Sequence, residues 1–306
     1  MRVFITGATG FVGLHVTNRL LENGHKVYAG GRNLEKIRAM FGPRVDPVSI
    51  DFSDAGSIGK ALWSLKPDVV VNLIGIISEA PAKGITFEDV QFRISKDLYD
   101  ACRMTGVGKV IHMSALGVHP DAPSRYHKTK LKAEQALQAS GLTYCIFRPS
   151  VIIGPEQKLF SDIKKVVHII PIVALPAGGG QMIQPVDVRD VSCAFAAAVD
   201  RNETDNKIYE LCGPVAISFR KMIESISQIW NKRFVFFNVP MRAMTWAAGI
   251  IERMMEAPPL SSDLMLMIWK DNICGIYGGA YVNGVEAVCG RTPIPFHDSM
   301  RWALLA

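Results

Sequence analysis

Thr6-Gly7-Ala8-Thr9-Gly10-Phe11-Val12-Gly13 is the stretch that decides the fold of this chain. It follows the apolar run 3–5 and precedes an amphipathic stretch that ends at Glu22, so its glycines stand where a strand turns into a helix. Gly7 suits a turn of positive φ, Gly10 lets the backbone approach a pyrophosphate, and Gly13 lets the helix pack closely on the strand. The helix amino terminus adds free N–H groups and a positive dipole. A second strand from Lys26 completes a βαβ unit, and together these features predict a dinucleotide site.

The first half of the chain alternates short β-branched runs with helical stretches. Strands are expected near 2–6, 26–30, 46–50, 68–74, 109–113 and 143–148, and helices near 11–23, 33–41, 55–65, 86–105 and 125–140. Apolar runs without alternation, such as 69–71, are typical of strands covered on both faces. We therefore predict an α/β fold, a Rossmann-type doubly wound parallel sheet, over residues 1–150.

Residues 151–306 have a looser pattern, and we expect a smaller carboxyl-terminal lobe for substrate or partner, interleaved with returning elements of the first domain. Residues 188–199 and 218–230 read as helices and 208–211 as a strand. Long loops are expected where prolines and glycines gather, at Pro155, Pro171, Pro176 and 178–180. Between 241 and 270 several methionines lie on apparently amphipathic helices; they are either adaptable core residues or a partner-binding face.

Composition limits the class of protein. The chain has 306 residues, of which 49% are hydrophobic and 20% charged, an ordinary globular composition. Because no apolar run approaches the length of a membrane span, we expect none. The sequence enters its first strand at Arg2 without a charged leader or signal segment, which favours a cytoplasmic location.

Metal and nucleic-acid binding are not expected. The six cysteines, at 102, 145, 193, 212, 274 and 289, show no Cys-x-x-Cys spacing, and we read them as reduced core residues rather than zinc ligands or disulfides. The net charge of +6 is spread along the chain, and no nucleic-acid recognition motif is present.

A candidate catalytic set follows the fifth expected strand. Nicotinamide chemistry needs a group that exchanges a proton near neutral pH, and a tyrosine, with a free pKa of about 10, needs a neighbouring cation for this. Tyr126 and Lys130 are four residues apart on an expected helix, so the ammonium would stabilise the phenolate and bind the cofactor ribose. Ser114 ends a strand at the carboxyl edge of the sheet, where its hydroxyl would polarise a substrate carbonyl. The alternative is that Tyr126 and Lys130 are ordinary surface residues.

With these residues in view, the chain resembles the short-chain dehydrogenase/reductase superfamily, in its extended or atypical branch. Four blocks carry the resemblance: the turn 6–13, the segment 51–54, the segment 72–75, and the Ser114, Tyr126 and Lys130 set followed by residues 148–155. Residues 184–191 and 290–296 are also similar to this branch. Within it, the likeness is to epimerase/dehydratase-like proteins and to the nucleotide-binding accessory subunit of respiratory complex I.

The resemblance implies roles for the matching positions. Asp51 would bind the adenine amino group, Ile74 and Gly75 would flank the adenosine ribose, and the backbone after Pro149 would pack on the nicotinamide carboxamide. The full set of implied cofactor residues is Gly7, Thr9, Gly10, Phe11, Val12, Arg32, Asp51, Phe52, Ile74, Gly75, Lys130, Pro149 and Val151. Gln91 stands where extended members commonly carry an asparagine that orders the lysine through water; a longer amide reaches the same water, or the relay is absent.

Charge at the end of the second strand predicts the cofactor. An NAD site usually has an acid there for the ribose hydroxyls, whereas this chain has Arg32. A guanidinium can hold a 2′-phosphate through two hydrogen bonds, so we predict NADP(H) over NAD(H), with NAD(H) still possible. If Arg32 is only a solvated charge at a helix start, the preference is undetermined.

Two classes of function remain open. The first is an NADP(H)-dependent oxidoreductase, or a related epimerase or dehydratase, with Tyr126 as acid/base, Lys130 tuning it and Ser114 orienting a carbonyl or hydroxyl. Its substrate is unidentified, but the apolar residues of 150–185, namely Leu159, Phe160, Ile169, Ile170 and Leu175, favour a small or lipophilic carbonyl compound such as a quinone-like one.

The second class is a cofactor-loaded accessory or assembly protein without turnover, associated peripherally with a membrane complex of the respiratory type. Gln91, the methionine-rich helices and the apolar loop 166–175 motivate it. A redox sensor with different affinities for the two oxidation states is a third reading. A homodimer through 86–105 and 125–140 is an expectation from relatives.

Overall fold

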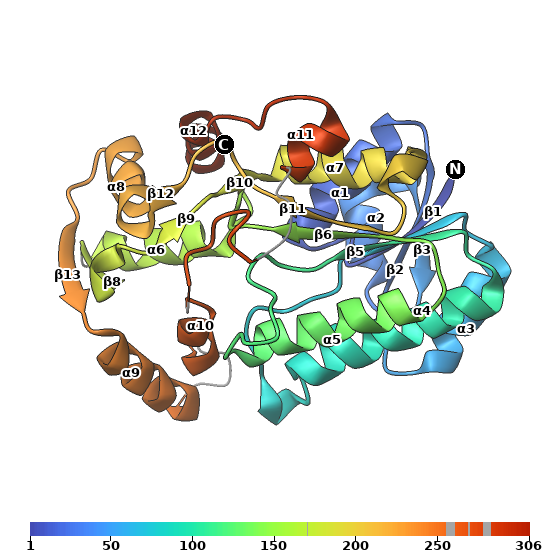
Figure 1. Cartoon of the computed structure of the whole chain (residues 1–306), viewed down its shortest axis with the longest axis horizontal. Helices are drawn as coiled ribbons and strands as arrows, with labels where there is room; N and C mark the ends of the chain where they lie inside the picture. The colour runs from blue at the N-terminus through green and yellow to red at the C-terminus, as the bar shows by residue number, and fades with distance from the viewer. Residues whose placement is uncertain (170, 255–260, 269, 278–282) are drawn as a thin grey trace.

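A seven-stranded parallel sheet forms the centre of the protein (Figure 1). The computed structural model describes residues 1–169, 171–254, 261–268, 270–277 and 283–306. Across the sheet the order is β11 (Lys207–Leu211), β6 (Tyr144–Pro149), β5 (Lys109–Met113), β4 (Val69–Asn72), β1 (Arg2–Thr6), β2 (Lys26–Gly31) and β3 (Val45–Ser49). Every neighbouring pair is parallel. The predicted doubly wound Rossmann fold is therefore confirmed, and its strands and helices lie close to the expected ranges.

Helices cover both faces of this sheet (Figure 1). One core packs the sheet against α1 (Phe11–Glu22), α2 (Leu34–Phe41), α7 (Val188–Asp200) and α11 (Gly284–Cys289). The other packs it against α3 (Ala55–Leu65), α4 (Ile94–Thr105) and α5 (Arg125–Ala139). Strands such as Val69–Asn72 are buried along their whole length, which explains their unbroken apolar sequence. The chain returns to this sheet at β11, so a strand from the second half of the sequence completes a sheet that begins with β1.

A smaller third core lies beside the carboxyl edge of the sheet. It contains α6 (Lys158–Ile169), α8 (Phe219–Ile229) and α12 (Phe296–Leu305) and three strand pairs. The pairs are β7 (Ile152–Ile153) with β10 (Val186–Asp187), β9 (Met182–Ile183) with β12 (Ile217–Ser218), and β8 (Ile172–Pro176) with β13 (Val235–Val239). Helices α9 (Met241–Met254) and α10 (Ser262–Met267) extend from it toward the start of α5 (Figure 1). The remaining short turns are η1 (Gly42–Arg44), η2 (Pro81–Lys83), η4 (Ala177–Gly179) and η5 (Asn202–Thr204).

Two expectations about this region need correction. Residues 172–176 are not a loop, because β8 pairs in parallel with β13, a partner about sixty residues away that local punctuation cannot reveal. Phe160 and Leu175 do not line a substrate site, since both are buried in the third core, and Ile170 lies outside the described residues. These side chains therefore give no information about the substrate.

The expectation of six reduced cysteines is wrong for two of them. Cys212 and Cys274 form a disulfide, with Cα atoms 6.3 Å apart, while Cys102, Cys145, Cys193 and Cys289 are free. The sequence separation of 62 residues gave no local signal, because only the fold brings the end of β11 beside residue 274.

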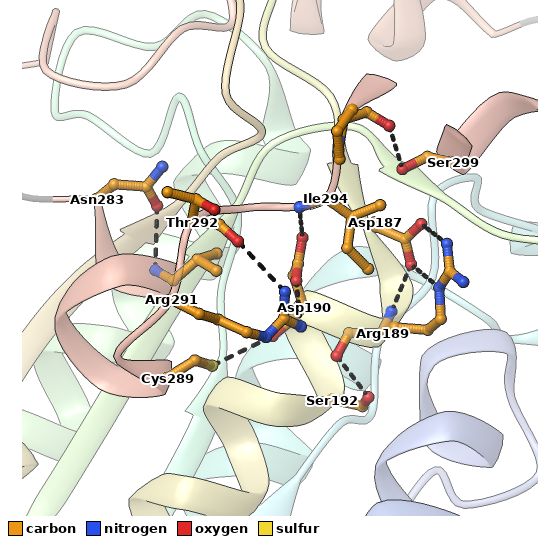
Figure 2. A network of polar contacts seen from close by, with 12 residues as sticks. Asp187, Arg189, Asp190, Ser192, Asn283, Cys289, Arg291, Thr292, Ile294 and Ser299 are labelled. Carbon is orange, nitrogen blue, oxygen red and sulfur yellow. Dashed lines mark hydrogen bonds and ion pairs between the residues drawn. The ribbon is translucent and has the colours of Figure 1, made fainter. Parts of the chain in front are cut away.

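A polar network fixes the start of α7 against the end of the chain (Figure 2). Asp187 caps α7 and binds Arg189 through two further hydrogen bonds of 2.9 and 2.7 Å. The Arg189 guanidinium lies 4.1 Å from the ring centre of Trp302 on α12, and this ring meets His15 of α1 edge-on. The network thus connects α1, α7 and α12.

None of the helices in the described ranges is both long and apolar enough to cross a membrane.

Candidate functional site

The glycine-rich turn has the geometry that dinucleotide binding requires. Gly7 has a φ of +70°, and Gly10 begins α1 with extended backbone and without a side-chain cap. A Cβ atom at Gly13 would lie 2.0 Å from the Gly7 carbonyl oxygen, so only glycine allows α1 to pack this closely on the turn. The first turn of α1 carries no acidic residue, which leaves its positive end open to an anion.

The side chains of the turn have different surroundings. Val12 is buried in the core, so only its backbone faces outward, while Thr9 is partly exposed. The Phe11 ring fills the space beside Gly154, where a Cβ atom would come within 2.6 Å of it. Phe11 therefore packs the turn against the segment that follows Pro149.

Thr6 and Asn72 join the ends of β1 and β4 directly under this turn. The Thr6 hydroxyl donates to Asn72 Oδ1 at 2.8 Å and accepts a hydrogen bond from the backbone N–H of Leu73. Asn72 Nδ2 donates to Ser95 of α4 at 3.0 Å. These bonds place Ile74 and Gly75 at the carboxyl edge of the sheet, next to the glycine-rich turn.

Lys130 is buried at this edge. Only 2% of the residue is exposed, and its ammonium donates to the Met113 carbonyl at 2.8 Å. A Cβ atom at Gly75 would lie 3.2 Å from Nζ, so the ammonium sits against the Gly75 backbone. Burial lowers the pKa of Lys130 to about 8. The structure therefore brings Lys130 and the Ile74–Gly75 segment together.

Tyr126 lies one turn before Lys130 on α5, but the two do not interact. Its ring packs edge-on against Phe87 and His127, and no hydrogen bond to its hydroxyl occurs among the described residues. Burial raises the pKa of Tyr126 to about 12, with no contribution from the Lys130 charge. The expected stabilisation of a phenolate is thus not present in this structure, and the phenol is protonated at neutral pH.

Ser114 is engaged by a buried ion pair that sequence reasoning missed. Its hydroxyl donates to Glu134 Oε1, one turn after Lys130 on α5, and Arg148 of β6 binds both carboxylate oxygens of Glu134. The Glu134 side chain is only 1% exposed. Because the Ser114 proton is directed to Glu134, its oxygen is left as an acceptor toward the site. Arg148, which follows the apolar run 145–147, was the one feature of the sequence that could have indicated this ion pair.

Asp263 of α10 holds the start of α5, a second contact that the sequence did not predict. Its Oδ1 accepts from the Arg125 N–H at 2.6 Å and its Oδ2 accepts from the Tyr126 N–H at 3.1 Å. Ser124 adds the ordinary side-chain cap to the His127 N–H. The position of the Tyr126 backbone therefore depends on a residue about 140 positions later.

Gln91 makes no direct hydrogen bond to Lys130 among the described contacts. Its amide nitrogen donates to the Ile76 carbonyl at 2.7 Å, and its Oε1 accepts from the Thr129 hydroxyl at 3.0 Å. It lies in a π-helical turn, η3 (Glu88–Arg93), which leads into α4. The departure from the family pattern therefore leaves the side-chain amide bound to Ile76 and Thr129. Whether it reaches Lys130 through water stays a prediction.

The expected adenosine contacts lie after β2 and β3. Arg32 is exposed, and its charge acts on Asp51. Hydrogen bonds from the Ser53 hydroxyl and N–H, followed by Arg32, lower the pKa of Asp51. Phe52 is partly buried against the second core. These residues form the exposed end of the candidate site.

The other end lies between β5 and β6. The Leu116 N–H donates to the Pro149 carbonyl at 2.9 Å, which continues the pairing of the two strands past their ends. The next residue, Ser150, donates to Asn272 at 2.6 Å, and Val151 is partly buried against the third core. The segment 271–277 thus lies across the carboxyl ends of these strands.

A comparison with known protein families identifies the nucleotide-binding half. Residues 7–162, which include the turn, Lys130 and Pro149, match the family model described as NAD(P)H-binding. The chain belongs to this family. With its seven-stranded sheet and site, it is a member of the extended, epimerase-like branch of the short-chain dehydrogenase/reductase superfamily. It binds a nicotinamide dinucleotide.

Curated relatives and solved structures extend the likeness beyond this half. The chain is 27% identical over 274 residues to the mitochondrial NADH-ubiquinone oxidoreductase 40 kDa subunit of Neurospora crassa, covering 88% of this chain and 71% of that protein. It spans between 56% and 71% of the length of the first five curated relatives.

Two solved structures share the fold. A nucleoside-diphosphate-sugar epimerase from Staphylococcus aureus superposes with a TM-score of 0.77 at 19% identity, over 98% of this chain and 100% of that one. An NADPH-dependent quinone oxidoreductase from Escherichia coli, complexed with NADPH, superposes with a TM-score of 0.73 at 18% identity, over 97% and 98%. At this identity both establish the fold alone.

Proposed function

We propose that the protein is an NADP(H)-dependent oxidoreductase of the extended short-chain dehydrogenase/reductase branch, acting on a carbonyl or hydroxyl group. A bound reduced nicotinamide would supply a hydride to a carbonyl carbon, and Tyr126 would donate the proton to the oxygen of that carbonyl. Lys130 binds the ribose of that nucleotide, and the backbone of the turn 7–12 binds its pyrophosphate.

The observation that carries this proposal is that one helix presents a buried ammonium and, one turn before it, a phenol without a hydrogen-bond partner among the described residues. Lys130 has three donors, and the Met113 carbonyl takes one of them. The others remain for ribose hydroxyls at the Gly75 edge. The Tyr126 phenol is protonated at neutral pH, so its hydroxyl can donate a hydrogen bond to a carbonyl oxygen.

Tyr126→Phe tests the catalytic role. The variant should lose at least about a hundredfold in the rate of NADPH oxidation with a carbonyl panel, since general acid catalysis contributes roughly 10²–10⁴-fold, and should keep its affinity for NADPH. The matched control is Tyr144→Phe, because Tyr144 begins β6, at the end of the strand away from the candidate site. This variant should keep both its turnover and its affinity for NADPH. Unchanged turnover in Tyr126→Phe would show that the phenol is not the acid.

We also propose a preference for NADP(H), which rests on Arg32. An exposed guanidinium that acts on Asp51 stands where it can hold a 2′-phosphate. In calorimetric titrations NADPH should bind more tightly than NADH, and Arg32→Ala should weaken NADPH binding about tenfold, the loss of one charge-assisted contact. The control is Arg38→Ala, on the exposed face of α2, which should leave the affinities for NADPH and for NADH unchanged. Equal affinities of the unmodified protein for the two coenzymes would refute the preference.

A second candidate function is a nucleotide-binding accessory protein of a respiratory complex, without turnover. One observation favours it: the Ser114 proton is held by Glu134, so the hydroxyl cannot polarise a carbonyl. The likeness to a mitochondrial NADH-ubiquinone oxidoreductase subunit points the same way. In this case NADPH raises the melting temperature, Tyr126→Phe has no phenotype, and the protein co-purifies with a membrane complex.

The remaining expectations stay predictions. The cytoplasmic location expected from the sequence stays a prediction, and the first five curated relatives are named as mitochondrial. A homodimer through α4 and α5, the division at residue 150 and the role of each cofactor residue also await experiment.

A further inference from the structure

Two free cysteines meet on the face of the sheet opposite α5, away from the candidate site. Cys193 lies on α7 and Cys289 ends α11, and both are partly exposed. The two helices pack side by side (Figure 1). The Cys289 sulfur lies 3.9 Å from the Asp190 carbonyl oxygen (Figure 2). Cys193 follows Asp190 by three residues, which places the two on the same face of α7. The two thiol groups are close enough for each to shift the pKa of the other.

The charges around this pair favour a thiolate on Cys193. Arg291 forms an ion pair with Asp190 at 2.5 Å and acts on both sulfurs (Figure 2), and Arg19 of α1 adds a second positive charge toward Cys193. The pKa of Cys193 is lowered to about 6, mainly by hydrogen bonding from Cys289 and to a smaller extent by the positive charges of these arginines. The same hydrogen bond and burial raise the pKa of Cys289. At neutral pH one sulfur is thus a nucleophile and the other a proton donor.

The other cysteines lack these features. Cys102 and Cys145 are buried, and burial raises the pKa of each thiol. Cys212 and Cys274 are already bonded to each other. Cys193 and Cys289 are therefore the two sulfurs in the chain that combine access from solvent, mutual contact and a cationic neighbour.

We propose that Cys193 and Cys289 form an oxidant-reactive pair, modified by hydrogen peroxide or an alkyl hydroperoxide to an intramolecular disulfide. The Cys193 thiolate attacks one peroxide oxygen, the O–O bond breaks, and the leaving hydroxide takes a proton to become water. Cys193 is then a sulfenic acid. The Cys289 sulfur attacks it, a second water leaves with the Cys289 proton, and an S–S bond joins α7 to α11. The peroxide accepts the two electrons that the sulfurs lose.

Peptide mapping tests this proposal on the whole protein. After brief treatment with hydrogen peroxide, blocking with N-ethylmaleimide and digestion, we expect a Cys193–Cys289 cross-linked peptide that is two hydrogens lighter than the separate peptides. Cys102 and Cys145 should remain thiols. If Cys193 and Cys289 remain thiols, or if peroxide stops at higher acids on one of them, the pair is not reactive in the proposed way.

Variants separate the two roles. In Cys289→Ala the Cys193 sulfenic acid has no partner and should be trapped by a 1,3-diketone probe, whereas Cys193→Ala should give neither the adduct nor a cross-link. Cys102→Ala is the matched control and should behave as the unmodified protein. Alkylation by iodoacetamide at pH 7 should be at least about tenfold faster at Cys193 than at Cys102, because the thiolate is the reacting species. Equal rates at the two cysteines would overturn the proposal whatever the fold of the variants.

Discussion

Lys130 shows at the scale of a single residue how burial sets the chemistry of the site. The ammonium is removed from water between the Met113 carbonyl and the Gly75 backbone, and its pKa falls to about 8. In the unfolded chain a lysine has a pKa of about 10.4. Between these two values the unfolded chain binds more protons than the folded protein.

This difference predicts a pH dependence of stability. Because the unfolded state binds more protons, the free energy of unfolding should rise with pH from about 8 to about 10, by at most about 1.4 kcal/mol per pH unit for one proton. Urea unfolding at several pH values measures this slope. In Lys130→Met the contribution should vanish, and a variant with the same slope as the unmodified protein would contradict the assignment.

A second prediction concerns the partner of Ser114. Glu134→Gln leaves the partly buried Arg148 guanidinium without the carboxylate that it binds, which should lower the free energy of unfolding by about 3–5 kcal/mol. Glu88→Gln removes an exposed ion pair with Lys132 and should cost less than about 1 kcal/mol. Denaturant unfolding of both variants compares the two pairs, and similar losses would mean that Glu134 is not a buried charge.

At the scale of elements, the position of α1 is set by one close approach and that of α5 by one long-range cap. A Cβ atom at Gly13 would meet the backbone of the turn, whereas Gly59 in α3 has open space around it. The first turn of α5 is held by Asp263 of α10. The same residue type, glycine, therefore has opposite consequences in two helices.

Alanine at these glycines should have opposite effects. Gly13→Ala should lower the free energy of unfolding by about 1–3 kcal/mol or more through overpacking, and should abolish NADPH binding by moving α1 off the turn. Gly59→Ala should raise the free energy of unfolding by up to about 1 kcal/mol, since alanine is the better helix former. Thermal unfolding with and without NADPH checks both. If Gly13→Ala retains tight binding, the close packing is not required for the cofactor.

The cap from α10 gives a prediction for Tyr126. Asp263→Ala should destabilise the protein by about 0.5–2 kcal/mol and lower turnover with little change in NADPH affinity, because it frees the Arg125 and Tyr126 N–H groups. Ser261→Ala removes a cap within α10 itself and serves as the control. Equal turnover in the two variants would show that the position of Tyr126 does not depend on Asp263.

For the whole molecule, local sequence patterns predicted the sheet well and the contacts between distant segments poorly. The order of strands and helices from residue 2 to residue 149 follows from periodicity and from the glycine-rich turn, because each unit depends on near neighbours. The Cys212–Cys274 bond, the pairing of β8 with β13, the Asp263 cap and the Glu134–Arg148 pair each join residues whose proximity arises only after folding. The sequence therefore offered a list of candidate site residues, but it did not predict the hydrogen bonds that these residues make.

The disulfide carries a prediction at this scale. A link across 62 residues should contribute about 4 kcal/mol to the free energy of unfolding by the loop-entropy estimate. Thiol titration of the unfolded, unreduced protein should find four free thiols, and the Cys212→Ser/Cys274→Ser double variant should be as stable as the reduced protein. Six titratable thiols would show that the bond does not form.

The contact of Trp302 with His15 bears on the order in which the molecule is completed during synthesis. A nascent chain that has reached α5 already contains the glycine-rich turn and Lys130, but it lacks β11 at the edge of the sheet and the ring that covers α1. Both are synthesised after α5, β11 at residues 207–211 and Trp302 within α12. The coenzyme therefore meets the complete sheet and the Trp302 contact only after residue 302 has been synthesised, and a variant that lacks residues 296–306 should give less folded protein in cells.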